Sequence, residues 1–183
     1  MKTVGFAVGM IITMMIFIVL AIMASSNLNT DKSIKTKYDE RQQIVRGQGY
    51  KYSFWTVICL IVLTCILDAC EISLPMKNTV LYFLIIAIGV MVHTTYCVFH
   101  DGYFGINNKP RQYYMAFVFI GLFNVFIGIV NSLQGRLVEN GKLDVPSINF
   151  FCGAMFVILG ISIVIKKYFI KEDEDMDEDD EEE

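Results

Sequence analysis

Three side chains of metal-ligand type recur along one apolar stretch of the chain. His93, Cys97 and His100 stand at positions i, i+4 and i+7, a spacing that would place two imidazoles and a thiol on one helical face. His93 and His100 would then stand about 10 Å apart along the helix axis, because each residue rises about 1.5 Å. Since one straight helix cannot easily surround an ion with these three groups, we expect a packed His93 and a His100 at the level of the headgroups, with no metal site and no cofactor.

Two further polar side chains interrupt apolar stretches. Asp68 would cost about 2.5–3.5 kcal/mol at the centre of a membrane helix, and its place near the end of a stretch would let it reach the interface. It is either an interfacial acid or a proton or cation site. Asn124 lies near the middle of another stretch, where an amide either hydrogen-bonds to a neighbouring helix or lines a pore. With His93, these residues are the ones that a small transporter, channel or immunity-type protein would use.

Catalytic signatures are missing from the sequence. It contains no HExxH motif, no glycine-rich phosphate loop after a strand, and no recognisable pair of nucleophile and base. We therefore expect a protein without enzymatic activity and without catalytic residues.

Five apolar stretches must position these side chains, at about 4–24, 54–74, 79–99, 113–133 and 148–166. Each approaches the roughly 20 residues that a bilayer-spanning helix needs. Hydrophobic residues make up 55% of the chain, above the roughly 45–50% of soluble domains. The sequence predicts an all-α membrane protein, with a bundle of five transmembrane helices forming one domain over 1–171.

The first stretch resembles a signal peptide but is too long for one. A signal peptide has an apolar region of about 7–15 residues, so we expect an uncleaved span, and a cleaved signal peptide is the alternative. Gly5 and Gly9 form a GxxxG pattern on it, which would allow a second copy to pack closely and form a homo-oligomer.

Basic residues set the expected orientation. With five spans, eleven Lys and Arg residues fall on one side of the membrane and four on the other. Because short loops rich in Lys and Arg stay in the cytoplasm, we expect a multi-pass cell-membrane protein with its N-terminus outside and its C-terminus in the cytoplasm.

Two loops would then share the cytoplasmic side. In the first, Ile34, Tyr38, Val45 and Tyr52 recur at helical spacing, which predicts an amphipathic cytoplasmic helix before the second span, with Gly47 and nearby Gly49 loosening the junction. The other loop, 100–111, is rich in turn-forming Gly, Asn and Pro.

These loops would meet through charge. An arginine can bind a carboxylate through two hydrogen bonds, so we expect Arg41 or Arg46 to contact Asp101. The candidate partner-binding residues are Asp39, Glu40, Arg41, Arg46, Tyr50, Asp101, Tyr103 and Asn107.

The same two loops resemble a family of small, uncharacterised, multi-pass membrane proteins of Gram-positive bacteria. The matching stretches are the run 39–52, which begins Asp39-Glu40-Arg41-Gln42, and the run 101–107 of sequence DGYFGIN. Gly102 departs from the alanine more usual in that family. The resemblance implies the architecture and, by analogy, a role as a membrane partner of small helix-turn-helix regulators.

Together these features predict a bacterial membrane protein that binds a cytoplasmic regulator through its loops and does not contact nucleic acid itself. The transporter, channel or immunity-type reading through Asp68, His93 and Asn124 is the alternative. Residues 172–183 carry eleven acidic side chains in twelve positions. Such a segment cannot bury a core, so we expect a disordered tail, one that modulates partner binding through its field.

Overall fold

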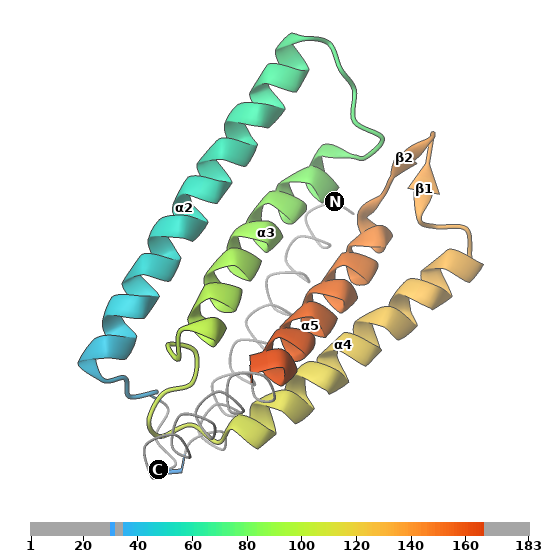
Figure 1. The fold of residues 1–183 in the computed structure, drawn as a ribbon. Helices are drawn as coiled ribbons and strands as arrows, with labels where there is room; N and C mark the ends of the chain where they lie inside the picture. Colours follow the sequence, from blue (N-terminus) through green and yellow to red (C-terminus); the bar gives the residue numbers. More distant parts are fainter. Residues whose placement is uncertain (1–29, 32–34, 167–183) are drawn as a thin grey trace, which may run out of the picture.

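Four long helices, running alternately up and down, form the described part of the molecule (Figure 1). The computed structural model describes residues 30–31 and 35–166. The helices are α2 (Glu40–Ala69), α3 (Asn78–Phe99), α4 (Pro110–Leu133) and α5 (Ile148–Ile165). All four are long and apolar enough to cross a membrane. The first span, with Gly5 and Gly9, and the acidic tail 172–183 lie outside the described residues.

The helix α2 is continuous over 30 residues, so the expected loosening of the junction at Gly47 and Gly49 is wrong. Glycine costs only about 1 kcal/mol in a helix interior, too little to interrupt a helix this long. Gly49 is buried and faces α3, where a Cβ atom would come within 2.9 Å of the His93 ring. The glycine therefore allows close packing of two helices instead of loosening one of them.

The end of α2 also differs from the expectation that the second span reaches residue 74. Glu71 adopts a left-handed conformation with φ of 57°. Its N–H donates to the Asp68 carbonyl at 3.0 Å, and the N–H of Ile72 donates to the Leu67 carbonyl at 2.9 Å. These two bonds form a Schellman motif, which satisfies the last carbonyls of the helix and turns the chain away from its axis. The other three spans begin and end within about three residues of the expected positions.

The helices pack in the order α2, α3, α5, α4 across the bundle, as Figure 1 shows. Small residues allow the close approaches. A Cβ atom on Gly89 of α3 would meet the Val57 side chain of α2 at 2.5 Å, and one on Gly153 of α5 would meet the Val125 side chain of α4 at 2.7 Å. Val80 and Cys97 are completely buried. Because only small side chains lie between neighbouring helix axes at these positions, the helices approach closely and van der Waals contacts hold them together. The outer faces of the helices remain apolar.

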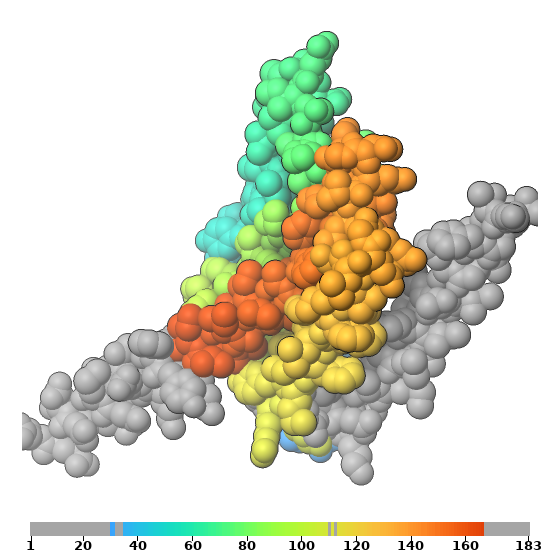
Figure 2. All heavy atoms as spheres, turned by 90° about the vertical axis from the view of Figure 1, so that its right-hand side faces the viewer, coloured from blue at the N-terminus to red at the C-terminus, as the bar shows by residue number. Residues whose placement is uncertain are grey.

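At one end of the bundle the α4–α5 connection forms a small hairpin of β1 (Val138–Glu139) and β2 (Lys142–Leu143), followed by the short 3-10 helix η1 (Val145–Ser147). The α2–α3 connection lies against it: Leu143 accepts from the Lys77 N–H and donates to the Pro75 carbonyl, both at 2.9 Å. We call this end the hairpin end. Seen from the α4–α5 side, the α2–α3 connection projects beyond the hairpin (Figure 2).

The other end holds the start of α2, the end of α3, the start of α4 and the end of α5. The described basic residues of both predicted cytoplasmic loops lie here, together with Lys166 at the end of α5. Lys77, Arg136 and Lys142 lie at the hairpin end. The alternation of the helices thus groups the basic residues as the charge pattern predicted.

Candidate functional site

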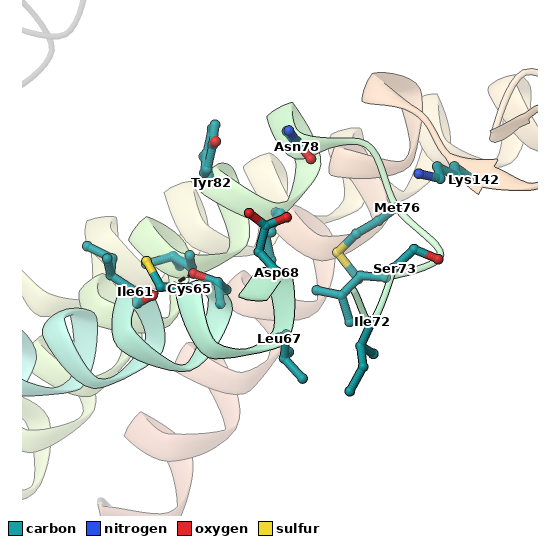
Figure 3. A pocket seen from close by; sticks show the side chains of 14 residues that line it. Ile61, Cys65, Leu67, Asp68, Ile72, Ser73, Met76, Asn78, Tyr82 and Lys142 are labelled. Carbon is teal, nitrogen blue, oxygen red and sulfur yellow. Dashed lines mark hydrogen bonds between the residues drawn. The ribbon is translucent and has the colours of Figure 1, made fainter. Parts of the chain in front are cut away.

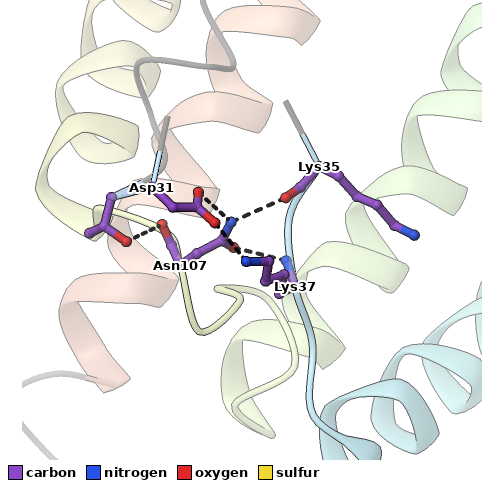
Figure 4. Close-up of polar contacts among 5 residues, drawn as sticks. Asp31, Lys35, Lys37 and Asn107 are labelled. Atoms are coloured by element: carbon purple, nitrogen blue, oxygen red, sulfur yellow. Dashed lines mark hydrogen bonds and ion pairs between the residues drawn. The ribbon is translucent and has the colours of Figure 1, made fainter. Parts of the chain in front are cut away.

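The chain before α2 and the α3–α4 loop interlock at the end opposite the hairpin. We call residues 30–31, 35–46 and 100–108 the loop junction. Asn107, only 6% exposed, lies at its centre (Figure 4). Its Oδ1 atom accepts from the Lys37 N–H at 2.8 Å, and its Nδ2 atom donates to Asp31 Oδ1 and to the Lys35 carbonyl, both at 3.1 Å. Its own carbonyl accepts from the Thr30 N–H at 2.7 Å. A single amide therefore bonds to segments about seventy residues away.

Asn108 organises the turn beneath this contact. Its Oδ1 atom accepts from the Gly105 N–H at 2.6 Å, and its Nδ2 atom donates to the Tyr113 hydroxyl at 3.1 Å. A Cβ atom on Gly105 would come within 2.4 Å of the Lys37 carbonyl oxygen and of Thr36 Cγ2. The turn can therefore lie against the incoming chain only with glycine at this position.

Gln42 joins the first turn of α2 to the α3–α4 loop. Its Nε2 atom donates to the Asp101 carbonyl at 3.1 Å and to the Phe104 carbonyl at 2.9 Å. A Cβ atom on Gly102 would come within 2.6 Å of Val45 Cγ1, so the backbone of Gly102 in the α3–α4 loop packs directly against the Val45 side chain of α2. The prediction that the two loops form a structured contact is confirmed.

The expected pairing of an arginine with Asp101 is wrong. The Asp101 carboxylate forms an ion pair with Lys166, the residue directly after α5, and the Arg46 guanidinium stacks 4.0 Å from the centroid of the Tyr38 ring. Arg41 is exposed. The reason is placement: the end of α5 brings Lys166 to the loop, whereas Arg46 already has an aromatic face beside it.

Asp39 and Tyr103 lie at the junction, but their contacts are local. The Asp39 carboxylate caps α2 by accepting from the Gln42 N–H at 2.6 Å, while Gln42 Oε1 accepts from the Asp39 N–H at 3.3 Å. Tyr103 lies in an aromatic cluster, edge-on to Phe104 at a centroid separation of 5.0 Å. Burial raises the pKa of Tyr103 to about 12, so its hydroxyl stays neutral even at a pH of about 10, where a free tyrosine ionises.

Tyr50 packs along α3, next to the junction. Its ring stacks on His93 with centroids 4.1 Å apart, and the Cys97 sulfur lies 3.8 Å from His93 Nε2. His100 instead stacks on Tyr96 and contacts its carbonyl at 2.9 Å through Nδ1. Within 30–31 and 35–166, no three His, Cys, Asp or Glu side chains are grouped closely enough to hold a metal ion.

The three intramembrane candidates are not brought together. Gly49 of α2 lies beside His93, and nineteen residues of helix, about 28 Å, separate Gly49 from Asp68 at the hairpin end. Asn124 Nδ2 donates to the Ile120 carbonyl of its own helix at 2.9 Å, so the hydrogen bond found for it lies within α4 instead of reaching a neighbouring helix.

The outer surface of the junction carries both charge and apolar area. Glu40 and Arg41 are exposed, and Ile44 and Ile106 are 65% and 69% exposed. Sequence reasoning missed these two isoleucines. It also missed Gln42, although its position three residues after Asp39 is the spacing of a capping box.

The hydrogen bonds between the two loops hold the surface of the junction in one ordered conformation. Among the side chains described there, no nucleophile is paired with a base. Comparisons of the chain with protein-family models, with curated proteins and with solved structures find no match.

Proposed function

We propose that this chain is a non-enzymatic, multi-pass protein of the bacterial cell membrane that binds a cytoplasmic regulator through the outer surface of the loop junction. In this proposal the junction end of the bundle faces the cytoplasm, and the hairpin end faces outside. With the first span predicted from the sequence at 4–24, the N-terminus in this proposal lies outside.

The observation that carries the proposal is the interlocking of two distant loops beneath exposed side chains. Asn107 and Asn108 are both less than a tenth exposed and hold the backbone of the junction, while Ile44 and Ile106 remain on its surface. A surface that is already ordered loses less conformational entropy when a partner binds. The exposed Ile44 lies one helical turn from the exposed Glu40 and Arg41, and an apolar contact beside charged residues is the pattern of many protein interfaces.

The alternative, a small transporter or channel using Asp68, His93 and Asn124, has weaker support. These residues come from three helices, and about 28 Å of helix separates Asp68 from Gly49, which lies beside His93. The Asn124 amide donates to a carbonyl of its own helix. A transport pathway needs such residues to face one cavity or pair with one another.

Orientation is tested by labelling single cysteines in a cysteine-free background. Ile106→Cys places a thiol at the junction, and Asn140→Cys places one in the exposed hairpin. An impermeant maleimide should label position 140 on intact cells and position 106 only after permeabilisation. Labelling of position 106 on intact cells would reverse the orientation and remove the basis of the proposal.

Partner binding is tested with photo-crosslinking residues placed at Ile44, Ile106 and, as control, Asn140. A cytoplasmic protein should crosslink from the first two positions and not from the third. The purified candidate should then bind the full-length chain in nanodiscs, and the double variant I44D/I106D should weaken this binding at least tenfold, because two apolar contacts are lost. Equal binding by the double variant would contradict the proposal.

A further inference from the structure

A cavity of about 460 Å³ opens at the hairpin end, between the end of α2, the α2–α3 connection and the start of α3. Its size falls within the range of roughly 300–1,000 Å³ typical of small-molecule sites. Figure 3 shows its polar side chains: the Asp68 carboxylate comes from α2, Asn78 from the start of α3, and Lys142 from the hairpin side. The cavity therefore presents one negative and one positive side chain.

The negative wall is not neutralised by its surroundings. Among the described residues, no hydrogen bond or ion pair is found for the Asp68 carboxylate, and the last turn of α2 holds no basic residue. The partial negative charge of a helix C-terminus adds to that of Asp68, so this wall would attract a cation. An acidic residue in the last turn destabilises the helix itself. The presence of Asp68 there therefore needs a reason other than helix stability.

The opposite wall favours an anion. Lys142 lines it, and the first turn of α3 contains no acidic residue and has no side-chain cap. The other nearby ammonium, on Lys77, is already paired with Asp144 at 2.8 Å and with Glu139. Ser73 and Tyr82 add hydroxyl groups to the lining. Several donors therefore surround the space, and a phosphate would use more of them than a carboxylate.

We propose that this cavity binds a zwitterion made of a primary ammonium joined to a phosphate, with the ammonium at Asp68 and the phosphate at Lys142 and Asn78. The group is either an aminoethyl phosphate lipid headgroup or the free small molecule, and the two share this chemistry. The apolar rim that includes Ile61 and Ile72, which are 43% and 54% exposed, can accept the adjoining acyl chains of a lipid.

Cys65 gives a direct readout on the wild-type protein, because it is an exposed free thiol that lines the cavity. Cys70 is also an exposed free thiol but does not line it, and serves as internal reference. Alkylation of the purified full-length chain by iodoacetamide is followed at each cysteine by peptide mass spectrometry. Phosphoethanolamine at ten times its dissociation constant should slow the reaction of Cys65 about tenfold and leave Cys70 unchanged. Ethanolamine and inorganic phosphate, each carrying one of the two charges, should protect much less.

The source of the group is decided by comparing two arms. Protection by soluble phosphoethanolamine in lipid-free detergent supports a free ligand. Protection of Cys65 in phosphatidylethanolamine nanodiscs but not in phosphatidylcholine nanodiscs, without protection by the soluble compound, supports a lipid headgroup. The trimethylammonium group of phosphatidylcholine cannot donate a hydrogen bond to Asp68. Absence of protection in both arms, or equal protection by phosphate alone, would overturn the proposal.

Charge variants give the second measurement. Asp68→Asn and Lys142→Gln should each weaken binding at least tenfold, because each removes a charge-assisted hydrogen bond. Glu71→Gln and Arg136→Gln remove charges from the same end of the molecule but outside the cavity lining, and should leave binding unchanged. Asp68→Asn should melt at the same or a higher temperature without ligand, since it removes an acid from a helix C-terminus. Equal loss in all four variants would indicate nonspecific electrostatics and refute the site.

Discussion

Truncation of Asn107 is the sharpest test of how the loop junction is held. In Asn107→Ala the Lys37 N–H loses its acceptor, and the side-chain amide bonds to Asp31 and the Lys35 carbonyl are lost. Each bond to a neutral partner contributes about 1 kcal/mol, and the bond to a carboxylate about 1.5–3 kcal/mol. Because the Asp31 side chain is 34% exposed and water can replace part of the interaction, we count this bond too at about 1 kcal/mol, which gives a total loss of about 3 kcal/mol.

Hydrogen exchange measures this loss locally. The N–H of Lys37 bonds to Asn107 Oδ1, and the N–H of Ile106 bonds to the Lys37 carbonyl at 2.9 Å. A loss of about 3 kcal/mol should speed exchange at both amides about 150-fold, or to the unprotected rate if the junction opens completely. Ile106→Ala is the matched control, because that side chain is 69% exposed and its removal leaves both backbone bonds in place.

An isosteric variant separates hydrogen bonding from volume. Asn107→Asp keeps the shape and one acceptor oxygen, but it turns the second oxygen toward Asp31 Oδ1 and the Lys35 carbonyl, which accept from the amide in the native protein. We expect protection at neutral pH to fall at least as far as in the alanine variant, because three acceptors then face one another. Exchange within about threefold of the wild-type rate in both variants would refute the account.

Two further predictions concern backbone contacts and pH. Gly105→Ala should open the junction, because its Cβ atom would lie 2.4 Å from the Lys37 carbonyl oxygen, whereas Gly47→Ala, with nothing within 4 Å, should stabilise α2 by about 0.5–1 kcal/mol; thermal unfolding of the two variants distinguishes them. At the hairpin end, hydrogen bonds to the Lys77 ammonium and the Val145 N–H hold the pKa of Asp144 below its usual value, and the Asp144 and Glu139 carboxylates raise the pKa of Lys77. Asp144 therefore contributes stability above its unfolded pKa of about 3.9, and this contribution is lost as the pH falls through the pKa of Asp144 in the folded protein. Lys77 contributes stability below its unfolded pKa of about 10.4, and this contribution is lost as the pH rises through the pKa of Lys77 in the folded protein. The difference in melting temperature between the wild type and Lys77→Met should be largest between these limits, and a difference that persists unchanged at acidic pH would contradict this assignment.

The linear sequence carries most of the information on the helices, because the membrane requirement acts on each segment separately. A run of about twenty apolar residues identifies a span without knowledge of its neighbours, and this predicted α3, α4 and α5 to within about three residues. Both errors on α2 involved tertiary or capping contacts. Gly49 was expected to loosen the junction but is a packing residue, and Glu71 was expected to extend the span but closes a Schellman motif.

The candidate site was only partly predictable. Shared sidedness was enough to predict that the segments around Asp39 and Asp101 meet, because loops at one end of a short bundle have little room to separate. Shared sidedness could not predict which individual side chains of the two segments form pairs. Arg46 and Lys166 carry the same charge, and only the relative position of the end of α5 decides that Asp101 pairs with Lys166.

Composition and pattern by themselves determined that this chain is helical, apolar enough to span a membrane and asymmetric in its basic residues, since these properties depend on residue type and spacing. The tertiary structure alone decided that Asn107 ties the chain before α2 to the α3–α4 loop, and that Asp68 and Lys142 line one cavity. Such contacts join residues about seventy positions apart, and their energy depends on geometry within a few tenths of an ångström, which the order of residues along the chain does not record.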